Sequence, residues 1–230
     1  MRVTVIGGTG HIGSYLVPLL VGLGHDVTVL CRGTRQPYVP DPAWRSVTTV
    51  TVDRKAEEAA GGFGSRVAEL ESDVVIDLIC FEPASASQLA EALHGRVRHF
   101  LHCGTIWVYG PSAQVPTTED APRRPIADYG RKKAEIEEYL LDRAHRNGFA
   151  ATVIHPGHIS GPGWAPINPA GYVNPSVFQT LANGDTLVLP NLGMETLQHV
   201  HAHDVARLFL AAMAGRSVAV GESFNAVAGT

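Results

Sequence analysis

Gly7-Gly8-Thr9-Gly10-His11-Ile12-Gly13 follows a short run of β-branched and aliphatic residues, Val3–Ile6, near the start of the chain. The stretch satisfies both G-x-x-G-x-x-G and G-x-G-x-x-G, which is the spacing of a tight turn between a strand and a helix. Such a turn lets the backbone approach a pyrophosphate and places the phosphates at a helix N-terminus. Glycine-rich turns also occur without a ligand, so the interpretation depends on this position in the chain. The motif predicts a dinucleotide site that includes Gly7, Gly8, Thr9, Gly10, His11, Ile12 and Gly13.

The rest of the chain alternates between short aliphatic runs and segments with helical spacing. Near-continuous apolar strands that alternate with helices are typical of a parallel sheet covered on both faces. We therefore expect an α/β, doubly wound parallel-sheet Rossmann fold. The expected strands are Val3–Ile6, Val27–Leu30, Val47–Val52, Val74–Leu78, His99–Cys103 and Ala151–His155, and the expected helices are 11–23, 63–71, 84–94 and 129–147.

The pattern changes after His155, where prolines and glycines predict an ordered loop over 156–176. Further on, the sequence predicts helices over 175–183 and 203–214 and strands over 186–190, 196–201 and 223–227. We expect a small, partly represented substrate lobe. The expected organisation is a nucleotide-binding domain over 1–156, a substrate-lobe segment over 157–200, and a final Rossmann helix and strand over 201–230.

Composition excludes several classes of protein. The 230 residues carry a formal net charge of −4, with 18 basic and 22 acidic residues, so a nucleic-acid partner is not expected. No apolar stretch is long enough to span a bilayer. Three cysteines without a C-x-x-C pair suggest reduced thiols. We expect a soluble, cytoplasmic protein that does not bind membranes.

Two further motifs contain groups suited to proton transfer. Tyr129 and Lys133 form a Y-x-x-x-K pair, and a spacing of four residues puts them on one face of a helix. A nearby ammonium is expected to lower the pKa of the phenol, which suits a general acid or base. This spacing is also common on exposed helices, so the pair alone does not favour catalysis. Thr105 follows the fifth predicted strand, in the stretch that ends with Val108-Tyr109-Gly110.

Together these motifs make the chain resemble the extended short-chain dehydrogenase/reductases, in particular the NAD(P)-dependent sugar epimerase/dehydratase group. Further matching segments are Thr118-Glu119-Asp120-Ala121-Pro122, the loop from Pro156-Gly157 to Gly161-Pro162-Gly163, and His201-Ala202-His203-Asp204-Val205-Ala206. The resemblance implies catalytic roles for Thr105, Tyr129 and Lys133, with Lys133 also contacting the nicotinamide ribose. It implies cofactor contacts from Asp53 to the adenine and from Pro156 and His158 beside the nicotinamide. The expected substrate is a sugar or sugar derivative, and a homodimer is one option for the assembly.

Departures from the group's pattern narrow the expected chemistry. The 4,6-dehydratases place Asp-Glu directly after the catalytic threonine, whereas this chain has Ile106-Trp107, which supplies neither acid nor base. A dehydratase is therefore disfavoured, while epimerase and carbonyl reductase both stay open. His155 stands where the group has arginine, and His158 replaces a frequent asparagine, which weakens the case for a nucleotide-sugar diphosphate. The chain also stops at Thr230, which predicts either a shortened product or a naturally short member.

The residues after the second predicted strand favour NADP over NAD, although NAD stays an alternative. Selectivity for NAD usually needs a carboxylate roughly twenty residues past the glycines. Cys31-Arg32-Gly33-Thr34-Arg35 contains none. Arg32 can stack on adenine and bind a 2′-phosphate, and Arg35 adds a second charge if the loop folds back. Both arginines are otherwise ordinary solvated loop charges.

The sequence also leaves two alternatives to consider, a metal site and a non-catalytic role. His199, His201 and His203 alternate before Asp204, and on a strand all three would share one face, as in a metal site. No other ligand cluster is evident, so we expect structural histidines and no metal. The second alternative is a nucleotide-binding sensor or scaffold that keeps the fold without turnover. The presence of Thr105, Tyr129 and Lys133 together argues against that alternative.

Overall fold

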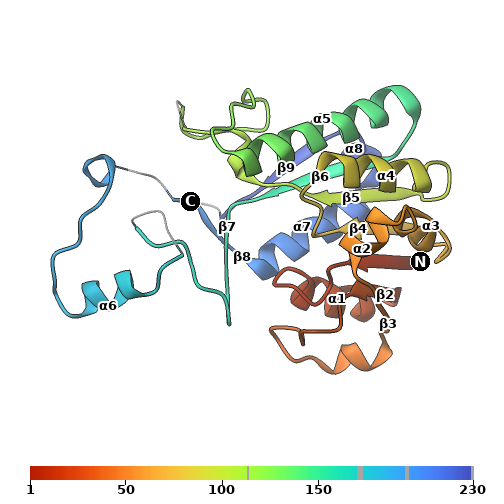
Figure 1. Cartoon of the computed structure of the whole chain (residues 1–230), viewed down its shortest axis with the longest axis horizontal. Coiled ribbons are helices and arrows are strands. Elements are labelled where there is room, and N and C mark those ends of the chain that lie inside the picture. Colours follow the sequence, from red (N-terminus) through yellow and green to blue (C-terminus); the bar gives the residue numbers. More distant parts are fainter. Residues whose placement is uncertain (113, 170–172, 195–196, 229–230) are drawn as a thin grey trace.

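A computed structural model describes residues 1–112, 114–169, 173–194 and 197–228 (Figure 1). Its main body is a seven-stranded sheet in the order β3-β2-β1-β4-β5-β6-β9, and all neighbouring strands are parallel. The strands are β1 Arg2–Ile6, β2 Asp26–Cys31, β3 Thr48–Thr51, β4 Val74–Asp77, β5 His99–Cys103, β6 Ala151–Pro156 and β9 Ser223–Ala226. Every residue of β4, β5 and β6 is buried, as expected for central strands covered on both faces.

Helices cover both faces of this sheet. One apolar core joins the sheet to α1 (Gly13–Gly22), α7 (Ala202–Ala214) and the short α8 (Arg216–Ala219). A second core, on the other face, joins it to α3 (Phe63–Ala68), α4 (Pro83–Leu93) and α5 (Asp128–Asn147). The predicted doubly wound α/β fold is confirmed. Among the described residues, none of the helices has the length and apolarity needed to cross a bilayer.

A lobe leaves the main body between β6 and α7 (Figure 1). It contains α6 (Ser176–Ala182), and a two-stranded parallel sheet of β7 (His158–Ser160) and β8 (His199–His201) connects it to the body. The chain then returns through α7 and α8 to β9, which pairs with β6. The lobe is thus inserted between two neighbouring strands of the main sheet.

The sequence-based expectations fail in short segments. The expected strand over 186–190 is wrong: these residues form no regular element, and Val188 is 85% exposed, because no other described strand pairs with them. The expected strand over 196–201 is β8 alone, and its first residue, 196, lies outside the described residues. The short elements α2 (Arg54–Ala59), α8 and β7 were not predicted, because three to six residues show too little periodicity.

The three alternating histidines do not share a strand, as the metal alternative would require. Strand β8 ends at His201, and His203 lies in the first turn of α7. His201 caps that helix, since its Nδ1 accepts a hydrogen bond from the His203 backbone N–H at 3.2 Å. A helix cap is a structural use of the ring. In the described part of the chain, no group of three or more metal-ligating side chains is placed to hold an ion.

The contact between Gly8 and Gly13 predicts the effect of a single methyl group. A Cβ at residue 13 would lie 2.1 Å from the Gly8 carbonyl oxygen, so Gly13→Ala must displace α1 from the turn. We expect it to lower the free energy of unfolding by about 1–3 kcal/mol, as overpacking does. Urea denaturation followed by circular dichroism measures the change.

The matched control is Gly22→Ala in the same helix. A Cβ there meets nothing within 4 Å, so the variant should be neutral or more stable by about 0.5–1 kcal/mol. If both variants were as stable as the original chain, the close approach of α1 to the glycine turn would be refuted.

Candidate functional site

The glycine turn joins β1 to α1 at the carboxyl edge of the sheet. Gly7 adopts a φ of +83°, and a Cβ there would meet Ile79 at 2.6 Å. Its N–H donates to the Leu30 carbonyl at 2.8 Å, and the Gly10 N–H donates to the Gly7 carbonyl at 3.0 Å. Only glycine combines this backbone conformation with this packing. The turn therefore leaves room for a ligand to approach its backbone.

A cleft of about 550 Å³ opens beside this turn, at the ends of β1, β2, β3 and β4. Ligands of doubly wound sheets bind at this edge. The structure brings five of the predicted cofactor residues together in its lining: Gly7, Thr9, Gly10, Arg32 and Asp53. The lining also contains Arg35, Lys55 and Glu82, which gives the cleft charges of both signs.

His11, Gly8, Ile12 and Gly13 do not line that cleft. The His11 ring is 6% exposed and stacks on Trp164, with centroids 5.0 Å apart, while Tyr38 packs at 5.2 Å. Burial first, and the charge of His201 second, lower the pKa of His11. The side chain is therefore neutral and enclosed by rings, and any cofactor contact from residue 11 would come from its backbone.

The two arginines after β2 differ in their surroundings. Arg35 donates to the Tyr38 hydroxyl at 2.6 Å, and its guanidinium lies 5.5 Å from the centre of that ring. Tyr38 is itself held by a hydrogen bond from its backbone N–H to Ser14 Oγ at 2.8 Å. The loop thus folds back, but toward Tyr38. Among the described residues, no side chain forms a hydrogen bond or ion pair with the Arg32 guanidinium. Its N–H donors are therefore available to a ligand.

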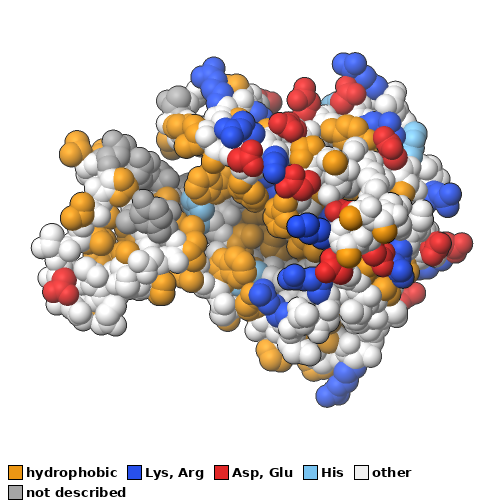
Figure 2. All heavy atoms as spheres, viewed as in Figure 1, with side chains coloured by type: hydrophobic (Ala, Val, Ile, Leu, Met, Phe, Trp, Pro, Cys, Tyr) orange, Lys and Arg blue, Asp and Glu red, His pale blue; other side chains and the backbone are white. Residues whose placement is uncertain are grey.

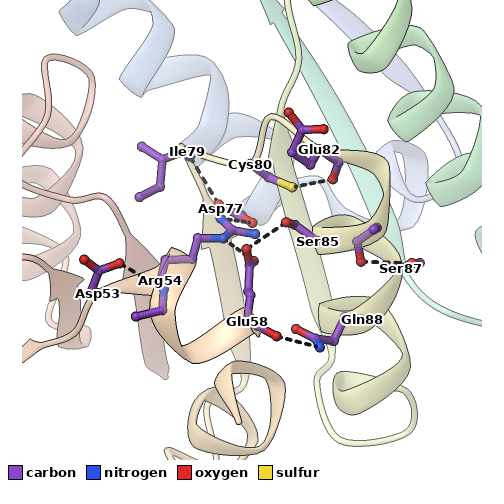
Figure 3. A network of polar contacts seen from close by, with 12 residues as sticks. Asp53, Arg54, Glu58, Asp77, Ile79, Cys80, Glu82, Ser85, Ser87 and Gln88 are labelled. Atoms are coloured by element: carbon purple, nitrogen blue, oxygen red, sulfur yellow. Dashed lines mark hydrogen bonds and ion pairs between the residues drawn. The ribbon is translucent and has the colours of Figure 1, made fainter. Parts of the chain in front are cut away.

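A buried ionic network under the cleft was missed by the sequence analysis (Figure 3). Arg54 donates to both carboxylate oxygens of Asp77, at 2.8 and 2.9 Å, and to Glu58 at 2.6 Å. Asp77 is fully buried at the end of β4 and also accepts from the Ile79 backbone N–H at 3.1 Å. The network therefore holds the chain segment that contacts Gly7. A carboxylate inside the apolar run 74–80 was the signal that could have identified it.

Asp53 has a structural task beside its expected contact with adenine. Its Oδ1 accepts a hydrogen bond from the Ala56 backbone N–H at 3.1 Å and so caps α2. Capping uses one carboxylate oxygen and orients the side chain at the rim of the cleft. The position of Asp53 is thus fixed by the start of the helix that carries Arg54.

The predicted catalytic residues lie together at the ends of β4 and β5. Thr105 begins the short helix Ile106–Val108, and its hydroxyl lies beside the Tyr129 phenol in the first turn of α5. Lys133 lies one turn further and is 1% exposed. Its ammonium donates to the carbonyls of Cys80 at 2.7 Å and Cys103 at 2.6 Å. Thr105 and Tyr129 therefore lie side by side, and Lys133 ties the same part of α5 to the ends of β4 and β5.

The electrostatics of Tyr129 differ from the sequence-based expectation. Burial of its hydroxyl end first, and then Cys103, raise the pKa of Tyr129 to about 12, and Thr105 acts in the opposite direction. Lys133 was expected to lower this pKa, and that expectation is wrong here. Burial lowers the pKa of Lys133 itself, and its ammonium is directed at two backbone carbonyls. Tyr129 is accordingly a protonated phenol at neutral pH.

A second buried network positions Thr105 from behind. Its backbone N–H donates to His155 Nδ1 at 3.0 Å, so the ring proton sits on Nε2. Nε2 lies 3.0 Å from Glu137 Oε1, and Arg123 donates to Glu137 Oε2 at 3.0 Å. His155 was noted in the sequence only as a departure from the group's arginine, and Glu137 and Arg123 were missed. The network fixes the backbone that carries the threonine.

The remaining predicted residues border the same place. Pro156 is the last residue of β6, where it pairs with Ala226, and His158 begins β7. The His158 ring lies 5.8 Å from the Trp107 ring, two residues beyond Thr105. The turn after β6 is thereby adjacent to the catalytic group.

The network behind Thr105 predicts an acid-sensitive stability. Burial opposes ionisation of Glu137, but His155 and Arg123 lower its pKa from 4.5 to about 2. A depressed folded-state pKa stabilises the protein above the unfolded value, and this contribution disappears as the pH falls from about 4.5 toward 2. The free energy of unfolding should therefore fall over this window, by roughly 3 kcal/mol from this group.

Urea denaturation between pH 6 and 2.5 measures that dependence. Glu137→Gln should flatten it, while Glu138→Gln, at the exposed next position of α5, should keep the original slope. An unchanged slope in Glu137→Gln would mean that the carboxylate is not ionised in the folded protein.

The chain is similar to known proteins in both sequence and structure. The profile of the NAD dependent epimerase/dehydratase family matches residues 3–226. The chain is 31% identical over 138 residues to the 2′-dehydrokanamycin reductase of Streptomyces kanamyceticus, which covers 60% of this chain and 37% of that protein. It is 28% identical over 230 residues to the chloroplast stem-loop binding protein of 41 kDa b of Arabidopsis thaliana, covering 97% and 58% respectively.

A third relative is the UDP-glucose 4-epimerase of Corynebacterium glutamicum, with 29% identity, 70% of this chain and 52% of that protein. The chain thus spans less than two thirds of the length of these relatives. Among solved structures, it is similar to the UDP-glucose 4-epimerase of Thermotoga maritima with UDP-glucose, at a TM-score of 0.76 and 24% identity, covering 100% of this chain and 78% of that one. The dTDP-glucose 4,6-dehydratase of Bacillus anthracis in complex with NAD also has a TM-score of 0.76, with 18% identity, 100% of this chain and 76% of that one.

Proposed function

This chain belongs to the NAD dependent epimerase/dehydratase family, as its motifs predict, and on that premise we propose that it is an NAD(P)-dependent oxidoreductase or epimerase. It would act by hydride transfer at a keto or hydroxyl carbon of a sugar or sugar-like substrate. The observation that carries the proposal is the placement of Thr105 beside Tyr129, with the buried Lys133 one helical turn further on. A protein that only binds nucleotides has no need of this group.

The described residues fit a dinucleotide. A glycine turn that no Cβ can enter, a cleft of about 550 Å³ and an arginine without a described partner supply a backbone cradle and a cation. Within it, Gly7, Thr9 and Gly10 would hold the phosphates, Asp53 the adenine and Arg32 a 2′-phosphate. Pro156, His158 and Lys133 would border the nicotinamide end. When bound, the nicotinamide supplies or accepts the hydride.

The protein's own groups move the proton. In the reductive direction Tyr129 donates its phenolic proton to the carbonyl oxygen, and Thr105 donates a hydrogen bond to the same oxygen. The phenolate left by this step is reprotonated from solvent. In the oxidative direction Tyr129 accepts the proton of the substrate hydroxyl as a phenolate and then releases it to solvent. Because burial raises the pKa of Tyr129 to about 12, the phenol holds its proton at neutral pH, which favours the reductive role. We propose that no metal ion takes part.

The residues after Thr105 favour an epimerase or carbonyl reductase over a 4,6-dehydratase. A 4,6-dehydratase would need an acid and a base there, and Ile106 and Trp107 provide neither. Epimerase and carbonyl reductase share the same first step and differ in whether the substrate is released after it. The proposed division of labour assigns residues 1–156 to the nucleotide, 157–200 to the substrate and 201–230 to the return into the sheet.

A second candidate function is a sensor or scaffold that binds a nucleotide without turnover. It is favoured by the similarity to the chloroplast stem-loop binding protein, which extends over 97% of this chain. Oxidation of NADPH by a keto-sugar panel distinguishes the two, because a sensor would bind the nucleotide without consuming it.

The first prediction for the proposed reaction concerns Tyr129→Phe. Loss of the general acid should reduce kcat by roughly 10²–10⁴-fold, while the Kd for NADPH stays unchanged. Steady-state NADPH oxidation and fluorescence titration give the two values. Tyr139→Phe, on the same helix, is the control, since its hydroxyl has no partner among the described residues. Retention of full kcat in Tyr129→Phe would remove this residue from the reaction.

The second prediction concerns the choice of cofactor. If Arg32 binds the 2′-phosphate, Arg32→Ala should weaken NADPH binding by roughly 10–100-fold and leave NADH almost unaffected. Arg35→Ala is the matched control and should have a smaller effect, because its guanidinium already contacts Tyr38. Equal binding of both cofactors by the original chain, or equal weakening of both in Arg32→Ala, would contradict the preference for NADP.

A further inference from the structure

We propose that the substrate half of the site takes an uncharged, phosphate-free ring compound that carries the keto or hydroxyl group, and that it discriminates against nucleotide-diphosphate sugars. The inference rests on the proposed function, because it concerns the substrate of the same Tyr129 and Thr105. It is carried by the aromatic surface around Tyr129 and by the distribution of charge along the two halves of the site.

Two large aromatic side chains are exposed beside the proposed proton-transfer site, Trp107 at 41% and Tyr129 at 43%. Phe81, which is 49% exposed, lines the cleft beside the glycine turn and adjoins Tyr129 at the boundary between the two halves of the site. The Phe81 and Tyr129 ring centroids are 6.4 Å apart. Trp107 extends this surface toward His158, which lies at 5.8 Å. Flat exposed rings bind the apolar face of a ring substrate by stacking.

The charges lie on the other half of the site. Arg32, Arg35 and Lys55 all line the cleft beside the glycine turn. By contrast, the sequence contains no lysine or arginine from residue 157 to residue 206, which includes the whole lobe. Figure 2 shows the same division: hydrophobic side chains line the hollow between the lobe and the body, and Lys and Arg side chains gather on the body. A diphosphate is normally bound by such cations.

His158 does not replace these cations. Burial, and then the charge of His199, lower the pKa of His158, so its ring is neutral at neutral pH. The His199 Nε2 lies 2.9 Å from the Ile167 carbonyl oxygen, with which it forms a hydrogen bond. A neutral imidazole donates a single hydrogen bond, which suits a hydroxyl or a carbonyl oxygen better than a diphosphate.

Cations on the adjoining elements are largely paired. Lys132 lies 2.9 Å from Glu82 and 3.3 Å from Asp128, and Arg123 is held by Glu137. Arg124 is exposed on the segment before α5 and has no carboxylate partner among the described residues. Arg124 is therefore a cation that could bind a phosphate near the site, and the experiment includes a variant that removes it.

The lobe itself continues the apolar character. It contains a hollow of about 500 Å³ whose lining includes Ile167, Phe178, Leu189 and Leu197 and no charged side chain. His199 belongs to this lining and lies 5.8 Å, ring to ring, from His158. The ring contacts from Trp107 to His158 and from His158 to His199 thus lead from the site to this hollow, which we propose accepts an uncharged extension of the substrate.

The experiment compares ligands on the protein saturated with NADPH. Calorimetry measures binding of UDP, UDP-glucose, a panel of free keto-sugars and a panel of cyclic aliphatic ketones, and NADPH oxidation measures turnover of the carbonyl compounds. We expect at least one neutral ring compound to bind and be reduced, and UDP and UDP-glucose to bind at least roughly 100-fold more weakly. The two neutral panels distinguish a carbohydrate from a non-carbohydrate ketone.

Single-residue variants test which side chains favour the neutral substrate. Trp107→Ala should raise KM for the neutral substrate by roughly 3- to 10-fold, with an unchanged Kd for NADPH, and Trp107→Phe should restore most of the loss. Arg124→Ala should leave the neutral substrate unaffected. Tighter binding of UDP or UDP-glucose than of every neutral compound would overturn the proposal, and so would the absence of any neutral ligand. Turnover of a UDP-sugar would leave the proposed function intact, whereas failure to bind NADPH would remove that function as well.

Discussion

The buried ammonium of Lys133 is the interaction on which the site depends. It lies between the carbonyls of Cys80 and Cys103, which follow or end the adjacent strands β4 and β5, and thereby joins both strand ends to α5. A charge out of contact with water is costly unless its donors are satisfied. Here two carbonyls and the negative charge of Asp77 compensate for burial. Tyr129, one turn before Lys133, is thus fixed relative to the sheet.

Two further buried networks support this centre, one on the β4 side and one on the β6 side of strand β5. Asp77 and Arg54 hold the chain between β4 and α4, while Glu137 and His155 hold the backbone of Thr105. In each network an ion pair satisfies a charge that the fold has removed from water. The geometry of the reacting groups is therefore set by side chains that themselves take no part in the proposed proton transfer.

The glycine turn, the alternation of elements and the order of Thr105, Tyr129 and Lys133 were predictable, because each depends on local spacing. The networks were not, because their members are far apart in sequence: Asp77 and Arg54 are 23 residues apart, and His155 and Thr105 are 50 apart. The wrong strand over 186–190 shows the same limit. Among the described residues, no strand pairs with the aliphatic residues there. A local sequence pattern does not indicate whether a partner strand lies beside it. The expected lowering of the Tyr129 pKa by Lys133 was not predicted correctly, because residue spacing indicates that two side chains are close but not where the ammonium points. Here it points at two backbone carbonyls.

The parallel pairing of β7 with β8 has a mechanical consequence. The chain enters and leaves the lobe through these two short strands, which are bonded to each other and continue into β6 and α7 (Figure 1). The lobe is therefore mounted on a double-stranded neck rather than on a single flexible linker. The hydrogen-bonded ladder ties the entry of the lobe to its exit. The neck thereby anchors His158 beside Trp107, and α6 lies beyond this anchor, in the middle of the segment that joins the two strands.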